Sequence, residues 1–242
     1  FAFCILHFAF CILHFAFCLL HFAFCILFFA FCIYAMALGA IFPRLGDMQL
    51  QMGIAEGQLG LSVIGAALGV QLSLLVASRV LRAVGFRWVI FVGIVIISVA
   101  ETIASLSLTP VAFFCWLFVA GLAIGVVEVA VNVEADRTEF HIGRRVMNRC
   151  HAFWSLGFFG SGLFGALIAQ LQISVFAHMI GFLILTSCSA LLLVWQHQPA
   201  LPRPGEESQS SNFARPTKPI LFLVALTLSS MLLEGAGIDW SV

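Results

Sequence analysis

Charged residues are scarce in this chain. Only 9% of its 242 residues are Asp, Glu, Lys or Arg, while 62% are hydrophobic. A soluble domain carries about 25% charged residues, so this chain cannot cover a folded surface with polar groups. The formal net charge is zero, and a neutral chain gives no signal of nucleic-acid binding. We therefore expect the lipid bilayer as a partner and no nucleic acid.

Several chemical motifs are also missing. The chain has no phosphate-binding loop, no Ser-His-Asp arrangement that could assemble outside lipid, and no metal-ligand spacing. It contains eight cysteines but no CxxC pair, so neither a zinc site nor a disulfide framework is expected. We expect no enzyme activity, no metal and no cofactor.

The few basic residues are grouped in three short gaps between apolar stretches, and only Arg44 lies elsewhere. In a polytopic membrane protein Lys and Arg stay on the cytoplasmic side, so every second loop is basic. The pattern therefore predicts a multi-pass protein with a cytoplasmic N-terminus. The three groups are Arg79, Arg82 and Arg87; Arg137, Arg144, Arg145 and Arg149; and Arg203, Arg215 and Lys218.

The apolar stretches have the length of membrane helices. A membrane helix needs about 20 apolar residues, and seven stretches of the chain meet that requirement. Small residues recur four positions apart in three of them, which lets helix backbones approach closely. The predicted spans are 22–43, 58–78, 88–107, 110–133, 152–171, 175–195 and 219–242, and the small-residue pairs begin at Gly65, Gly121 and Gly157.

A heptapeptide repeat, FAFCILH and close variants, fills residues 1–35. It lacks the polar positions of a coiled coil, and a repeated DNA unit TTTGCAT would encode it through all three frames. We therefore interpret the repeat as replication slippage or a gene-calling artefact that forms or extends the first helix; a separate additional span is the alternative. The chain begins with Phe1 and stops inside the last span, so we expect a fragment.

The polar segment 196–218 is rich in Pro, Ser and Glu, which is typical of a flexible linker. It separates a six-helix N-terminal half, residues 22–195, from a single helix of a truncated second half, residues 219–242. Tracing the basic groups places this linker on the cytoplasmic side.

Acidic residues inside membrane spans are functional candidates because burying them in lipid is costly. Glu128 is the strongest candidate, since Asn132 follows it by four residues and shares its helix face. A carboxylate and an amide together can hydrogen-bond the hydroxyls of a polyol. The alternative interpretation is a structural hydrogen bond to a neighbouring helix or to a cytoplasmic Arg, since Glu128 lies in the inner half of its span. The other acids in predicted spans are Glu101, Glu234 and Asp239.

Two further groups of residues are candidates of lower specificity. Glu234 and Asp239 flank two glycines near the end of the last span, where a helix that unwinds could form a transport site. His151 and Trp154 open the fifth span, where an aromatic ring could stack on a sugar or simply anchor the helix at the membrane interface. Glu101 has an alternative role as a hydrogen-bonded residue of the bundle.

Three motifs resemble the MosC/YbjJ-like branch of the major facilitator superfamily, which is related to the fucose permeases. They are LAIGVVEVAVN at 122–132, RVMNRCHAFWSLG at 145–157 and EGAGIDWS at 234–241. The resemblance implies an all-α fold of two six-helix halves, of which this chain holds the first half and helix seven. It also implies a monomeric protein of the bacterial inner membrane that moves a small solute by alternating access.

The fucose permeases use an acid of span four in an E-x-x-x-N context, and this role carries over to Glu128 and Asn132. The resemblance therefore implies transport of a sugar or polyol-like solute, with protons as a candidate coupling ion. This chain differs in two places: span one has Phe42 where those permeases have an acid, and the loop after span two has Arg82 where the family has Asp. An efflux carrier on the same fold and a non-functional fragment remain the alternatives.

Overall fold

The computed structural model describes residues 26–204 and 217–239, with side chains described as far as Ser229. Within these ranges the chain forms helices and no strands. The fold divides into two compact units, Phe1–Leu201 and Pro202–Val242. The prediction of an all-α membrane protein is confirmed, because six of the described helical segments are long and apolar enough to cross a bilayer.

The first membrane segment is a helix in three parts. Its described part is helical over residues 26–39 and then bends. The bend contains the short 3₁₀ helix η1 (Phe42–Arg44), which includes Pro43, and α2 (Leu45–Met52) continues to a left-handed Gly53. The segment therefore extends beyond the predicted end at residue 43. The prediction for the heptapeptide copies in residues 1–25 lies outside the described residues.

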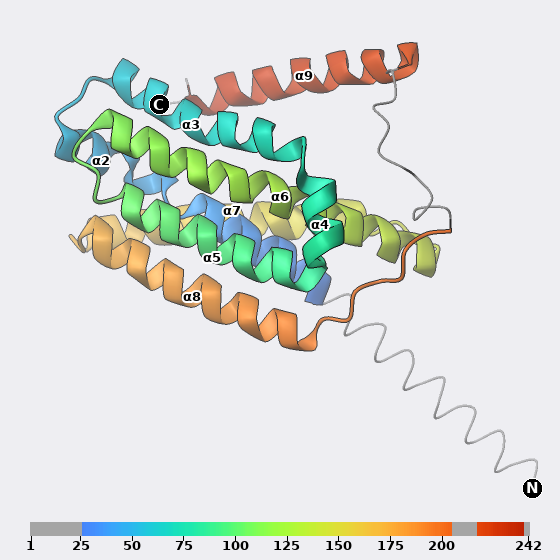
Figure 1. Cartoon of the computed structure of the whole chain (residues 1–242). Helices are drawn as coiled ribbons and strands as arrows, with labels where there is room; N and C mark the ends of the chain where they lie inside the picture. The colour runs from blue at the N-terminus through green and yellow to red at the C-terminus, as the bar shows by residue number, and fades with distance from the viewer. Residues whose placement is uncertain (1–25, 205–216, 240–242) are drawn as a thin grey trace, which may run out of the picture. The chain divides into compact units, whose positions relative to one another are not determined.

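The remaining helices of the first unit alternate in direction and lie side by side in Figure 1. A short helix, α4, connects the second and third membrane segments at the end of the bundle that carries most of the arginines; we call this the basic end. The helices are α3 (Glu56–Leu74), α4 (Ala77–Val84), α5 (Phe86–Ala104), α6 (Pro110–Ile142), α7 (Met147–Gln170) and α8 (Val175–Gln196).

Helix α6 is the longest helix among the described residues, and local sequence signals define both of its ends. Thr109 caps the start by accepting a hydrogen bond from the Ala112 amide, and Pro110 occupies the first turn, where its missing N–H costs nothing. Gly143 ends the helix in a left-handed conformation with φ of 65°. With 33 residues, α6 is about 50 Å long. It therefore continues well past residue 133, where the predicted span ends.

The glycines at four-residue spacing lie at the closest helix contacts. A Cβ atom on Gly65 or Gly69 would meet the backbone of α6, and one on Gly121 would meet the backbone of Ala66 on α3. On α7, a Cβ at Gly157 would meet the carbonyl of Cys32 in the first helix. The small residues therefore let α3 pack on α6 and the first helix pack on α7. Both contacts position the candidate site.

The second unit contains α9 (Lys218–Asp239). Its described side chains, residues 217–229, are exposed and mostly apolar. The helix is continuous to Asp239, so the glycines at 235 and 237 do not interrupt it.

Candidate functional site

Glu128 lies near the middle of α6 and is partly buried. Its carboxylate accepts a hydrogen bond from Asn132, whose Nδ2 atom lies 2.9 Å from Oε1. The same amide nitrogen lies 2.8 Å from the backbone carbonyl oxygen of Glu128. The structure therefore brings together the two residues that the sequence places on one helix face, and Asn132 holds the carboxylate in a fixed orientation.

A third residue, Tyr34, completes this cluster from the first helix. The Tyr34 side chain is 1% exposed and hydrogen-bonds the Glu128 carboxylate. Because a carboxylate only accepts hydrogen bonds when it is ionised, the phenol donates. Tyr34, Glu128 and Asn132 form what we call the Glu128 cluster, which joins two helices far apart in sequence. A solute hydroxyl that entered this cluster would meet an acceptor, a donor and a phenol that can do both.

Sequence reasoning missed Tyr34 because it lies in the last copy of the heptapeptide repeat. One signal was present: the sixth position of the repeat is Leu in the first four copies and Tyr in the fifth, and Tyr34 is the only tyrosine in the chain. A polar ring at a position otherwise filled by Leu indicates a partner that the repeat itself does not supply.

His151 and Trp154 lie on α7 beside the first helix. The His151 side chain is exposed, and its ring meets the edge of Phe31 with centroids 5.5 Å apart. Trp154 is partly buried and stacks on Phe158 at 5.3 Å with an interplanar angle of 9°. The two residues form an aromatic surface at the basic end of α7. Within the described residues no hydrogen bond joins either of them to Glu128.

The other predicted acids are separated from the Glu128 cluster. Gly93 of α5 faces Val127 of α6, and Glu101 lies eight residues further along α5, about 12 Å along the helix axis. Glu101 is 3% exposed, and within the described part of the chain no hydrogen bond reaches its carboxylate. Glu234 and Asp239 fall in α9, but their side chains lie outside the described residues.

A second carboxylate on α6, Glu134, was not predicted. It is 1% exposed, and its Oε1 atom lies 2.8 Å from Nε2 of His197 and 2.7 Å from the backbone nitrogen of Ala200. The ring of Phe86 packs against His197 with centroids 4.8 Å apart. These contacts fasten the segment that follows α8 to the basic ends of α5 and α6. The sequence interpretation ended the span at residue 133 and so treated Glu134 as part of a loop.

Arg44, the basic residue outside the three groups, is buried at the opposite end of the bundle. Its Nε atom lies 2.6 Å from Oδ2 of Asp47, and Nη2 lies 3.0 Å from the carbonyl oxygen of Ile173. The side chain therefore joins the first membrane segment to the turn between α7 and α8. Arg44 departs from the charge pattern for a structural reason, because its buried side chain is paired with Asp47.

Replacing Arg44 by methionine is expected to reduce the free energy of unfolding by about 1–3 kcal/mol. The Ile173 carbonyl would lose its hydrogen bond, while Asp47, which is partly exposed, could return to water. The measurement is unfolding of the purified chain in mixed micelles, followed by circular dichroism. Arg144→Met serves as the control because Arg144 is exposed. Equal stability of the two variants would show that the Arg44 contacts contribute nothing.

No group of three or more His, Cys, Asp or Glu residues within the described ranges is arranged to hold a metal ion. The chemistry offered by the described site is therefore that of hydrogen bonding and charge, carried by the Glu128 cluster.

Comparison with known proteins gives two relatives and no family model that matches. The chain is 28% identical over 193 residues to an uncharacterized transporter of Sinorhizobium fredii (strain NBRC 101917 / NGR234), a match that covers 78% of this chain and 50% of the relative. It is 26% identical over 190 residues to an uncharacterized MFS-type transporter of Yersinia pestis, with 78% of this chain and 48% of the relative covered. The chain spans about half the length of these curated relatives.

These matches agree with the architecture of the first unit. Six helical segments capable of crossing a membrane, without strands in the described ranges, are what one half of a major facilitator superfamily protein contains. The described chain is therefore all-α with six membrane-capable helices, and its similarity to these two transporters, one of them named as MFS-type, supports the major facilitator superfamily without assigning a branch.

Proposed function

We propose that this chain supplies the N-terminal half of a secondary transporter for a small polar solute of the sugar or polyol class. In this proposal the solute binds between two halves of the protein and crosses the membrane by alternating access. Two curated relatives named as transporters support membrane transport. The class of solute rests on the MosC/YbjJ-like resemblance and on the Glu128 cluster.

The observation that carries the proposal is the bond between Glu128 and its two partners. A carboxylate inside a membrane bundle is costly, and this one lies between Tyr34 and Asn132 in the inner half of the span predicted at 110–133. Its neighbours are neutral, so no buried cation balances its charge within the cluster. Such a carboxylate can exchange its hydrogen bonds for those of a solute hydroxyl, or take up a proton as the solute moves.

The remaining predicted residues receive subsidiary roles in the proposal. His151 and Trp154 would line the basic end of the pathway, where Trp154 could stack on a sugar ring. Glu234 and Asp239 would act in the second half. Glu101, buried in α5, would serve the bundle or a proton step.

The test is transport and binding of a defined panel of solutes by the purified chain in proteoliposomes. We expect at least one of L-fucose, D-galactose, D-mannitol and myo-inositol to bind, and to enter faster when the outside is more acidic. Because the chain spans about half of each relative, binding is measured beside uptake. Extrusion of lipophilic cations with no binding of the panel would favour the efflux alternative and contradict the proposal.

A further inference from the structure

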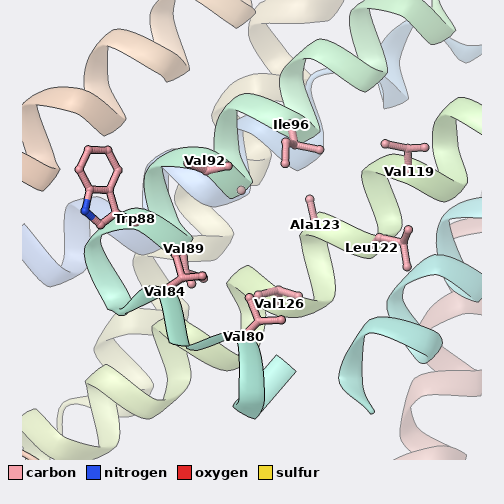
Figure 2. A pocket seen from close by; sticks show the side chains of 11 residues that line it. Val80, Val84, Trp88, Val89, Val92, Ile96, Val119, Leu122, Ala123 and Val126 are labelled. Carbon is pink, nitrogen blue, oxygen red and sulfur yellow. The ribbon is translucent and has the colours of Figure 1, made fainter. Parts of the chain in front are cut away.

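An apolar groove lies on the bundle where α4, α5 and α6 meet (Figure 2). Its volume is about 350 Å³, within the range of small-molecule sites. All eleven lining residues are apolar or glycine, and they come from three helices. Val80 and Val84 of α4 close the basic end, Val92 of α5 and Val119 of α6 lie on its two long sides, and Trp88 stands at the edge.

The groove is open at its rim and is nearly as long as a lipid chain in one leaflet. Side chains on its rim are substantially exposed, with 43% for Val92, 39% for Ile96 and 36% for Val119. From Trp88 to Ile96 it extends about 12 Å along α5, close to the roughly 15 Å hydrocarbon depth of a leaflet. Trp88 is 57% exposed, as is usual for tryptophan at a membrane interface.

Three arginines stand at the basic end of this groove. Helix α4 is amphipathic: Val80, Leu81 and Val84 share its apolar face, while Arg79 and Arg82 are exposed. Gly85, with φ of 82° and ψ of 154°, makes the sharp turn into α5, a conformation essentially restricted to glycine. This turn places Arg87 in the first turn of α5, directly after the helix that bears the other two arginines.

No anionic partner of these arginines lies in the described part of the chain. Within the described residues none of the three forms an ion pair or a hydrogen bond through its side chain. The Nε atom of Arg87 is buried without an acceptor. Neither α4 nor the first turn of α5 contains an acid. The basic end of the groove therefore presents three arginines without ion pairs, among the described residues, beside an apolar groove.

We propose that this groove binds one acyl chain of an anionic phospholipid, with the lipid phosphate held by Arg79, Arg82 and Arg87. The guanidinium group matches phosphate oxygens in pairs, which makes arginine a suitable ligand for this head group. A zwitterionic lipid also carries a phosphate, but its own cationic group cancels that charge, so it would fill the groove without adding net negative charge beside the three arginines. A second protein helix in the groove would need acidic residues of its own at the basic end to pair with the arginines.

The test uses the whole 242-residue chain in nanodiscs with equal amounts of phosphatidylglycerol and phosphatidylcholine. Native mass spectrometry then counts the lipids that stay bound after release from the nanodisc. We expect retained phosphatidylglycerol to exceed phosphatidylcholine by at least about fivefold, the gain roughly expected from a single basic residue at an anionic surface. Equal retention of the two lipids by the wild-type chain would overturn the proposal.

Two kinds of substitution test the contribution of the head-group contacts and that of the groove separately. Replacing Arg79, Arg82 and Arg87 by glutamine should reduce the number of retained phosphatidylglycerol molecules to that of phosphatidylcholine. The pair Arg79→Gln and Arg82→Gln, both at exposed positions, should lose most of the preference even if Arg87 matters for folding. The double substitution Val92→Phe and Val119→Phe should fill the groove and reduce lipid retention, although all three arginines remain.

Two controls decide whether the site is specific. Glutamine at Arg144, Arg145 and Arg149 removes the same charge from exposed positions between α6 and the first turn of α7 and should keep the lipid preference. Soluble glycerol phosphate should not displace the lipid, because it has no chain to occupy the groove. The proposal is wrong if that control triple loses the preference equally, if glycerol phosphate displaces the lipid, or if the chain is released as a lipid-free dimer.

Discussion

Replacing Glu134 by leucine is expected to reduce the free energy of unfolding by about 2–6 kcal/mol, because two buried groups lose the oxygen to which they hydrogen-bond. Leucine fills a similar volume but leaves Nε2 of His197 and the amide of Ala200 without their acceptor. Each buried donor left unpaired costs about 1–3 kcal/mol. The measurement is unfolding of the purified chain in mixed micelles, monitored by circular dichroism.

Two comparison variants show whether the hydrogen bonds cause this loss. Glu134→Gln keeps an acceptor oxygen, so it should cost clearly less than leucine. Glu56→Leu removes an exposed carboxylate at the start of α3 and should change stability by less than about 1 kcal/mol. If Glu134→Leu is no less stable than Glu56→Leu, the contact between α6 and the segment after α8 does not stabilise the bundle.

Replacing Gly121 by leucine is expected to be about as disruptive as a severe core mutation, with a loss of about 3 kcal/mol. A Cβ atom at this position would meet the backbone oxygen, carbonyl carbon and Cα of Ala66. Backbone atoms cannot rotate away as a side chain can, so α3 and α6 must separate. Unfolding in mixed micelles again gives the free energy.

The matched control for this substitution is Gly160→Leu on α7. Gly160 is exposed, and a Cβ built on it meets nothing within 4 Å. Because glycine is a poor helix former, leucine there should leave the stability unchanged or raise it slightly. Similar losses in both variants would mean that the glycine effect is not one of helix contact.

The membrane architecture could be predicted from the sequence because its cause is local. Length and hydropathy of each stretch determine whether it can cross a bilayer, and the four-residue spacing of Gly65 and Gly69 predicts a close contact face. Helix ends were harder, since α6 runs on through a charged segment to Ile142. Helix propensity continues the helix as far as its cap at Gly143, whereas hydropathy alone ends the predicted span at residue 133.

Only part of the candidate site could be predicted from the sequence. Asn132 could be paired with Glu128 because i and i+4 share a helix face. Tyr34 could not, because its contact with Glu128 depends on how the first helix packs against α6. The bonds of Glu134 to His197 and of Arg44 to Ile173 likewise join residues 63 and 129 positions apart. No local pattern encodes such pairs.

The most direct test of the Glu128 cluster as a solute site is equilibrium binding of the solute that the panel identifies, measured on detergent-solubilised chain by equilibrium dialysis. A charged hydrogen bond contributes about 1.5–3 kcal/mol, so Glu128→Gln should weaken binding by roughly 10- to 150-fold. Glu56→Gln, the same substitution at an exposed position, should bind like the wild type. If Glu128→Gln remains folded and binds the solute as tightly as the wild-type chain, the Glu128 cluster is not the solute site.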